Sequence, residues 1–244
     1  MVPKQGEDPE VKRMIEEVRR LPDCAAANAL WEQVACAAET RGDLETAWRA
    51  RCAILGSSAS HNAPRFETLF MNLAWCLAVS DKEPDRFAPS GILWQYKWVV
   101  TQAPEYASIP RSVLVGLVAD MDQRFIRAGW GRRAGLHKRV ELHDMLGEPD
   151  IALGAIEAWR AVPRDRGSDC MACEASTMAE LLQKCGQDEQ AVREARRIVA
   201  GQLSCATVPH CTFGALLPSL LRLGRLDLAR TLYDKGRRLV ASMQ

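Results

Sequence analysis

The sequence predicts an all-α protein, folded as a right-handed α-solenoid of stacked helical hairpins. Apolar residues recur at the spacing of one helix face, a glycine–alanine pair recurs along the chain, and no useful stretch alternates between apolar and polar residues. The chain has 244 residues, of which 48% are hydrophobic and 26% charged, so it can bury a sizeable core. We expect a flexible N-terminus over residues 1–10 and a single helical-repeat domain over residues 11–244.

The helices follow in order from apolar spacing and from the prolines and glycines that interrupt it. The first begins at Asp8-Pro9, because proline suits the first helical position. The expected helical segments after it are 25–55 with a break at Gly42-Asp43, 65–82, 90–103, 111–128, 132–146, 149–161, 171–184, 188–200, 211–223 and 226–240. Residues 81–89 form a polar loop within the second hairpin. The helix over 111–128 is expected to be amphipathic, with an apolar face of Val113, Val115, Leu117, Met121 and Phe125.

A glycine followed five residues later by an alanine marks the turn of each recognisable hairpin. The pairs are Gly42 with Ala47, Gly147 with Ala152, Gly186 with Ala191, and Gly224 with Ala229. Glycine ends the first helix without a Cβ penalty, and alanine lets the second helix lie close against it. The last three glycines are spaced by 39 and 38 residues, which suits a helix–turn–helix unit of about 34 residues with a slightly long connector.

The stretch from Cys170 to His210 has the spacing of metal ligands. Cys170 and Cys173 stand at the start of the first helix of a hairpin, Cys205 follows its second helix, and His210 begins the next. Because the start of the first helix and the end of the second lie at the same end of a hairpin, all four can meet at one edge. Three cysteines and a histidine form a common structural zinc site, with no position open for water. Cys211 competes as the fourth ligand.

The predicted zinc ion would hold the repeats over residues 165–244 in a fixed arrangement. Two alternatives remain: Cys170 and Cys173 are free or structural thiols, or they form a redox C-x-x-C. The redox alternative is weak, because no βαβ pattern surrounds the motif. The nine cysteines are an odd number, and the chain has no apolar segment typical of a signal peptide, so we expect a reduced, cytoplasmic protein.

Two further features are candidates for partner binding. Arg124, Arg127, Arg132 and Arg133 belong to a stretch over 124–139 that lacks acidic residues and could bind a phosphate backbone or an acidic peptide. Acidic residues flank it closely, and a solvated helix face is the simpler interpretation, with His137 and Glu141 as an ordinary surface pair. Trp94 and Trp98 stand four residues apart on one helix face and could line a concave groove, although tryptophans commonly fill cores.

Several positions resemble the tetratricopeptide repeat. Trp31, Ala35, Ala38 and Ala47 stand at the relative positions of that family's pattern, although no unit carries the whole set. A narrower resemblance, over roughly residues 30–240, is to a group of bacterial tetratricopeptide-repeat-like proteins. Its segments are Leu93–Val99, Asp169-Cys170-x-x-Cys173, Leu203-Ser204-Cys205, Pro209-His210 and Leu223-Gly224-Arg225-Leu226. This resemblance implies a fold and a site rather than an activity, and it favours His210 over Cys211, because the group carries Pro-His there.

The predicted function is that of a non-enzymatic scaffold for a peptide or protein partner, with a structural zinc site. No nucleophile-elbow, zinc-protease or phosphate-loop motif is present, so catalysis has no visible residues. Lys and Arg number 32 against 31 acids, which gives no overall attraction to nucleic acid or anionic membranes. The alternatives are a nucleic-acid-associated protein that uses the stretch over 124–139, and a redox- or metal-responsive regulator.

Overall fold

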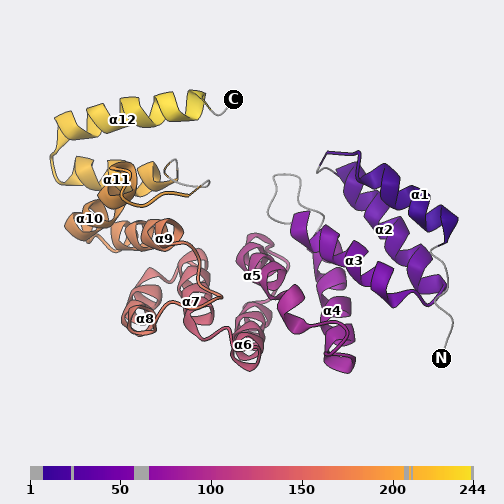
Figure 1. Cartoon of the computed structure of the whole chain (residues 1–244). Coiled ribbons are helices and arrows are strands. Elements are labelled where there is room, and N and C mark those ends of the chain that lie inside the picture. The colour runs from indigo at the N-terminus through magenta and orange to yellow at the C-terminus, as the bar shows by residue number, and fades with distance from the viewer. Residues whose placement is uncertain (1–7, 23–24, 58–65, 206–208, 210, 243–244) are drawn as a thin grey trace. The chain divides into compact units, whose positions relative to one another are not determined.

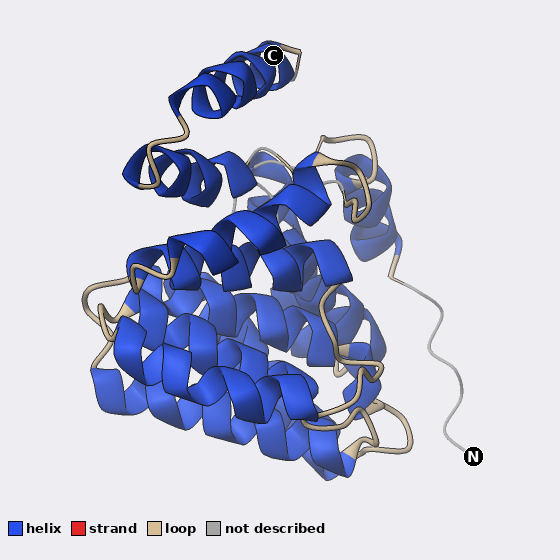
Figure 2. Cartoon of the chain, turned by 90° about the vertical axis from the view of Figure 1, so that its left-hand side faces the viewer, coloured by secondary structure: helices blue, strands red, loops and turns tan. Residues whose placement is uncertain are grey.

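The computed structural model describes residues 8–22, 25–57, 66–205, 209 and 211–242 (Figure 1). This part of the chain folds into helices joined by turns and loops, without a strand, which confirms the all-α prediction for it (Figure 2). Its α-helices are α1 (Pro9–Val18), α2 (Ala25–Thr40), α3 (Leu44–Gly56), α4 (Phe66–Lys82), α5 (Leu93–Gln102), α6 (Arg111–Arg127), α7 (Arg133–Met145), α8 (Pro149–Ala161), α9 (Met171–Lys184), α10 (Asp188–Val199), α11 (Thr212–Arg222) and α12 (Leu226–Ala241). The short 3-10 helices η2 (Pro89–Gly91) and η3 (Ala103–Glu105) flank α5.

The helices are divided between two compact units. Met1–Gly129 contains α1 to α6, and Trp130–Gln244 contains α7 to α12. That the two units form one helical-repeat domain, as expected for residues 11–244, stays a prediction. No helix among the described residues is long and apolar enough to cross a membrane.

The four glycines of the repeated pair end the first helices of four hairpins. Their φ angles lie between 68° and 75°, in the left-handed region where a Cβ is unfavourable. The hairpins are α2–α3, α7–α8, α9–α10 and α11–α12. The partner alanines, Ala47, Ala152, Ala191 and Ala229, are at most 5% exposed. The sequence pattern therefore predicted correctly where the chain turns and where the paired helices approach.

The buried face of α6 differs from the prediction. Phe125 is buried as expected, but Val113 and Val115 are each 44% exposed, and Leu114 and Val118 are buried in their place. The buried positions are spaced by four or seven residues, which keeps them on one side of a helix. Val113 and Val115 are two residues apart and point in different directions, so they cannot share that side.

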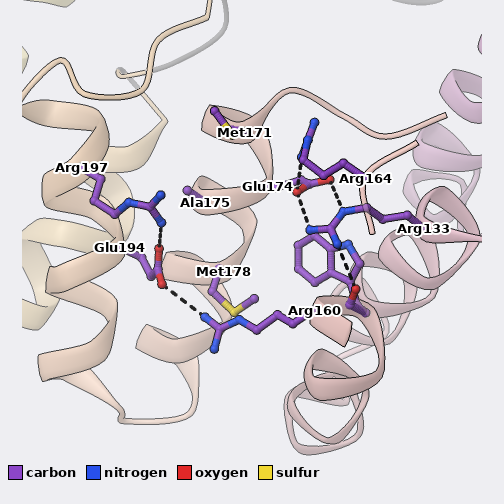
Figure 3. Close-up of a pocket in the computed structure, with 10 residues that line it drawn as sticks. Arg133, Arg160, Arg164, Met171, Glu174, Ala175, Met178, Glu194 and Arg197 are labelled. Carbon is purple, nitrogen blue, oxygen red and sulfur yellow. Dashed lines mark hydrogen bonds and ion pairs between the residues drawn. The ribbon is translucent and has the colours of Figure 1, made fainter. Parts of the chain in front are cut away.

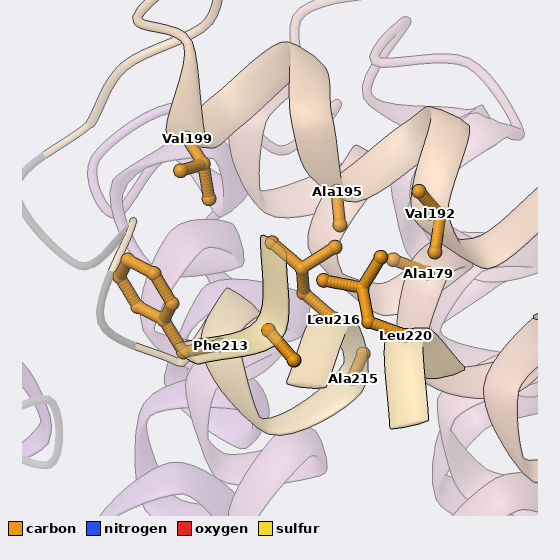
Figure 4. Packing of buried hydrophobic residues seen from close by; sticks show 9 residues of the cluster. Ala179, Val192, Ala195, Val199, Phe213, Ala215, Leu216 and Leu220 are labelled. Carbon is orange, nitrogen blue, oxygen red and sulfur yellow. The ribbon is translucent and has the colours of Figure 1, made fainter. Parts of the chain in front are cut away.

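Two large apolar clusters lie next to each other in the second unit. Trp159 of α8 lies in the first cluster with Val140 of α7 and residues of α9 and α10. The second cluster joins α9 and α10 to α11 through Leu216 and Leu220 (Figure 4). In the same cluster Phe213 packs so closely on α12 that a Cβ added to Gly236 would lie 3.2 Å from its ring. The two clusters hold α9 between neighbours on both sides.

Candidate metal centre

Three of the predicted metal ligands meet at one end of the α9–α10 hairpin. The Sγ atoms of Cys170, Cys173 and Cys205 all lie within 4.8 Å of one another. The shortest separation described is 3.5 Å, between the Sγ atoms of Cys173 and Cys205. Cys170 is exposed and the other two are half-buried, so the cluster lies at the surface and can hold a metal ion.

The start of α9 positions two of the thiols. Cys170 is the N-cap residue, with φ of −64° and ψ of 154°, and its Sγ accepts a hydrogen bond from the backbone N–H of Cys173 at 3.3 Å. An N-cap acceptor satisfies one of the N–H groups that the first helical turn leaves unpaired. The positive end of the helix dipole also favours negative charge on a ligand set at this end of α9.

The end of α10 brings the third thiol to the same place. Gly201 has a φ of 79°, and its N–H bonds to the carbonyl of Ile198 at 2.9 Å, which closes the helix. After Gly201 the chain changes direction, and Leu203 and Cys205 pack against an apolar cluster of Ala172, Ala175 and Ile198. A small apolar contact therefore carries Cys205 to the start of α9.

A buried polar network holds the residue before Cys170. The Asp169 carboxylate lies 2.9 Å from Nδ1 of His137 and 3.3 Å from Nζ of Lys138. His137 is 1% exposed and stacks on Trp159 with ring centroids 4.3 Å apart. His137 and Glu141, which the sequence placed at the surface, are thus part of a buried link between α7 and the cysteine loop. Partners distant in the sequence enclose this face of α7.

Charge compensation keeps Lys138 and Glu141 ionised. Burial lowers the pKa of Lys138, but the charges of Glu141 and Asp169 outweigh it and raise that pKa above its usual value. Burial acts to raise the pKa of Glu141, and the charge of Lys138 reverses the effect and lowers it. Nζ of Lys138 lies 2.6 Å from the Glu141 carboxylate. Buried charges paired at such distances remain charged and fix the geometry of the loop that they hold.

The Cys173 thiol is poorly ionised without a cation. Burial, followed by hydrogen bonds with Cys170 and Cys205, raises the pKa of Cys173 well above its usual value. A divalent ion among the three sulfurs would reverse this preference, because metal-bound thiols lose their protons. Sulfur ligands suit zinc and other soft or borderline ions rather than magnesium or calcium.

The fourth predicted ligand, His210, lies outside the described residues. Its competitor Cys211 is described, and its Sγ does not belong to the group of thiols within 4.8 Å. Burial raises the pKa of Cys211, and the nearby Glu180 carboxylate adds to that effect. Among the described residues the cluster thus has three sulfur donors.

The basic stretch is divided between separate environments. Arg124, in the first unit, binds Asp81 through both terminal nitrogens at 2.7 and 2.9 Å and also contacts Asp120. Arg133, in the second unit, is paired with a carboxylate of α9. Arg127 and Arg132 are exposed. Two of the four predicted arginines are therefore already bound to carboxylates.

The predicted tryptophan pair lies on α5. Trp94 is 39% exposed, and Trp98 is half-buried. Nζ of the buried Lys97 lies 3.6 Å from the centroid of the Trp94 ring, where the ring face attracts a cation. An intramolecular cation thus occupies one face of the more exposed ring.

A pocket that the sequence did not reveal opens beside the metal centre. Its volume is about 210 Å³, and it lies between the α7–α8 and α9–α10 hairpins (Figure 3). Its lining residues are Arg133, Trp159, Arg160, Arg164, Met171, Glu174, Ala175, Met178, Glu194 and Arg197. They come from four helices and one loop with no fixed spacing, so no motif in the sequence could have indicated them.

Comparison with known proteins adds no relative from which a role could be transferred. No protein-family model, curated protein or solved structure matches this chain.

Proposed function

We propose that this chain is a non-enzymatic helical-repeat scaffold that binds a peptide or protein partner and contains a structural zinc site. In this proposal the hairpins stack as a right-handed, tetratricopeptide-repeat-like solenoid. One observation carries the proposal: α9 begins at the thiol cluster and continues as a wall of the pocket. Cys170 and Cys173 stand at its first turn, and Glu174 and Met178 line the pocket within the next two.

The zinc part of the proposal rests on the donor set. Three sulfurs within 4.8 Å of one another satisfy three corners of a tetrahedron, and His210 is the proposed fourth ligand. A site with four protein ligands leaves no position for a reacting water, so its role is to hold the loop after α10 against the start of α9. The network around Asp169 supports this role, because metal ligands are commonly held by a second layer of hydrogen bonds.

The binding part rests on the pocket and on the recurrence of the hairpins. Each hairpin buries its alanine between its two paired helices, as helical repeats do, and arrays of such repeats present extended surfaces to peptides. The pocket opens where two hairpins adjoin. The zinc ion would then maintain the position of the helix that forms one wall of that surface.

Metal analysis of the purified chain tests the site. We expect one zinc ion per chain in the wild type and its loss in Cys173→Ser, with a lower Tm, because metal-binding energy contributes to folding. Cys36→Ser is the matched control, since Cys36 is an exposed cysteine of α2 in the other unit. A wild-type chain whose thiols all react as free thiols in the presence of zinc would contradict the proposal.

A second pair of variants identifies the fourth ligand. His210→Ala should weaken zinc binding, whereas Cys211→Ser should leave its affinity unchanged. The opposite result would assign the position to Cys211. A disulfide between Cys173 and Cys205 in the protein isolated without reductant would instead favour a redox-responsive regulator.

Peptide selection tests the binding part. A random library of short peptides is passed over the immobilised, zinc-loaded full chain. We expect enrichment of related sequences that bind the zinc-loaded chain more tightly than Cys173→Ser. A library from which no sequence is enriched would contradict the proposed function.

A further inference from the structure

We propose that the pocket between the α7–α8 and α9–α10 hairpins binds an acidic side chain of a peptide, with an apolar neighbour of that residue packed on its methionines. This inference rests on the proposed function and names the chemistry of the partner. It is carried by two groups of ion-paired residues on opposite sides of the pocket, each an Arg–Glu–Arg triad.

The first triad is Arg133, Glu174 and Arg164. Arg133 binds both carboxylate oxygens of Glu174, at 3.1 and 2.9 Å, and Arg164 binds one of them at 2.6 Å. The Arg133 side chain is 12% exposed and that of Arg164 is 37% exposed. One glutamate is thus shared by two arginines, and the arginine nearer to solvent provides the accessible charge.

The second triad is Arg160, Glu194 and Arg197. Nη2 of Arg160 lies 3.2 Å from one carboxylate oxygen of Glu194, and Nη1 of Arg197 lies 2.8 Å from the other. Both arginine side chains are about half exposed, at 50% and 49%. Each uses one nitrogen for this contact, and the described residues offer neither guanidinium another partner. The remaining N–H groups can therefore bind a second carboxylate.

The pocket therefore combines an excess of positive charge with an apolar centre. Four arginines against two glutamates leave a net charge of +2 on the lining residues. Met171, Ala175 and Met178 lie between the two triads (Figure 3). Met171 is 54% exposed and lines the pocket, so a partner can reach it. Methionine adapts to varied apolar partners, and arginine holds carboxylates in a two-pronged geometry.

The size of the pocket indicates one side chain rather than a whole small molecule. Its volume of about 210 Å³ holds roughly seven water molecules at about 30 Å³ each. Pockets for drug-sized ligands and cofactors usually measure about 300–1,000 Å³. An aspartate or glutamate side chain with part of its neighbour fits this space, while the rest of a peptide continues over the surface.

A peptide fits this charge pattern better than a nucleic acid. Nucleic-acid binding depends on many phosphate contacts, commonly about six to ten, along a continuous basic surface. Here two carboxylates stand among the four arginines, and apolar side chains separate the triads. An isolated carboxylate beside an apolar group matches that arrangement, whereas a row of phosphates would meet Glu174 and Glu194.

The test measures binding of a dye-labelled peptide from the library selection to the zinc-loaded full chain. We expect the enriched peptides to share an acidic residue next to an apolar one, and its replacement by the amide to weaken binding at least about tenfold. Arg160→Glu should weaken binding to a similar extent. Arg196→Glu is the matched control, because Arg196 is an exposed arginine of α10 outside the pocket lining, and it should change binding less than about twofold.

A third variant separates binding from a structural role of the triad. Glu194→Gln removes the internal carboxylate that competes for Arg160 and Arg197, so it should tighten binding by up to roughly fivefold. If Glu194 only maintained the fold, the substitution would weaken peptide binding instead of tightening it. Zinc content and Tm of every variant are measured alongside, and they should equal those of the wild type.

Four results would overturn the inference. The enriched peptides could lack an acidic residue, or they could bind Arg160→Glu as tightly as wild type. Either result would be compatible with the proposed function but would show that the pocket is not the binding site for an acidic residue. Absence of any enriched peptide would overturn both. Binding of a single-stranded DNA oligonucleotide that Arg160→Glu abolishes, without any such effect on peptides, would assign the pocket to nucleic acid.

Discussion

Arg133 and Glu174 are joined by two parallel hydrogen bonds, from Nε to Oε1 at 3.1 Å and from Nη2 to Oε2 at 2.9 Å. The pair connects the first residue of α7 to the first turn of α9. The two side chains are 12% and 9% exposed, and Arg133 also donates to the backbone carbonyls of Trp159 and Val162. One guanidinium therefore ties together α7, the end of α8 and the helix that begins at the metal centre.

Removal of one partner of this pair should be costly. Arg133→Met leaves a nearly buried carboxylate short of its main partner, and we expect a loss of about 3 kcal/mol in the free energy of unfolding. That corresponds to a Tm lower by roughly 6–12 °C. The double variant Arg133→Met with Glu174→Met should be less destabilised than the sum of the single ones. Strict additivity in chemical denaturation would contradict the coupling.

The metal-free chain and the zinc-loaded chain should respond oppositely to pH. Burial and the neighbouring thiols raise the pKa of Cys173 above its usual value of 9.0, so without metal its contribution to stability is present below about pH 9 and lost above it. Zinc binding requires thiolates, so zinc affinity should rise as the pH increases from 6 to 8. For each proton that binding releases, the affinity should rise by up to roughly tenfold per pH unit.

Thermal melts and zinc titrations at several pH values check both effects. Cys173→Ser is the control, because it should fail to bind zinc at every pH tested and should reduce the alkaline loss of stability of the metal-free chain. Part of the loss of stability at alkaline pH should persist in the variant, because two other groups also have raised pKa values. Burial raises the pKa of Tyr96, and the hydrogen bond with Cys52 raises the pKa of Cys76. A zinc affinity independent of pH would contradict thiolate ligation.

Gly201 should be required for the position of Cys205. Its φ of 79° suits glycine, and Gly201→Ala should cost about 1–2 kcal/mol and weaken zinc binding, because the chain leaves α10 in the direction that this residue sets. Gly154→Ala is the matched control inside α8, where a Cβ likewise meets nothing within 4 Å. It should raise stability by about 0.5–1 kcal/mol without a change in zinc affinity. Equal effects of the two variants would contradict this account.

The last hairpin should depend on its buried leucine. Leu216 is fully buried in the cluster between α9, α10 and α11, and Leu216→Ala should cost about 2–5 kcal/mol. Leu221, on the same helix, is 56% exposed, and Leu221→Ala should stay within about 0.5 kcal/mol of wild type. Urea unfolding measures both. A small loss in Leu216→Ala would show that α11 does not fold together with α9 and α10.

The hairpins and the thiol cluster follow from local rules, and the sequence predicted both. Gly186 turns the chain between α9 and α10, because a positive φ is a property of one residue. Cys170 and Cys173 stand one helical turn apart whatever surrounds them. The second helix of the hairpin returns the chain to the end where the first helix began, and Cys205 follows that second helix. The hairpin topology alone therefore predicts that Cys205 lies near the other two thiols.

The tertiary structure alone decided which polar side chains are buried and which pairs they form. His137 and Lys138 look like surface residues in the sequence, yet α9 and the loop before it cover them and supply Asp169. The pocket arose in the same way, because Arg160 of α8 and Glu194 of α10 share no local spacing. Helix periodicity fixes which residues share a face, but only the packing of other helices determines whether that face meets water, a carboxylate or the core. The ring of Trp94 shows the same dependence, since a buried lysine occupies one of its faces.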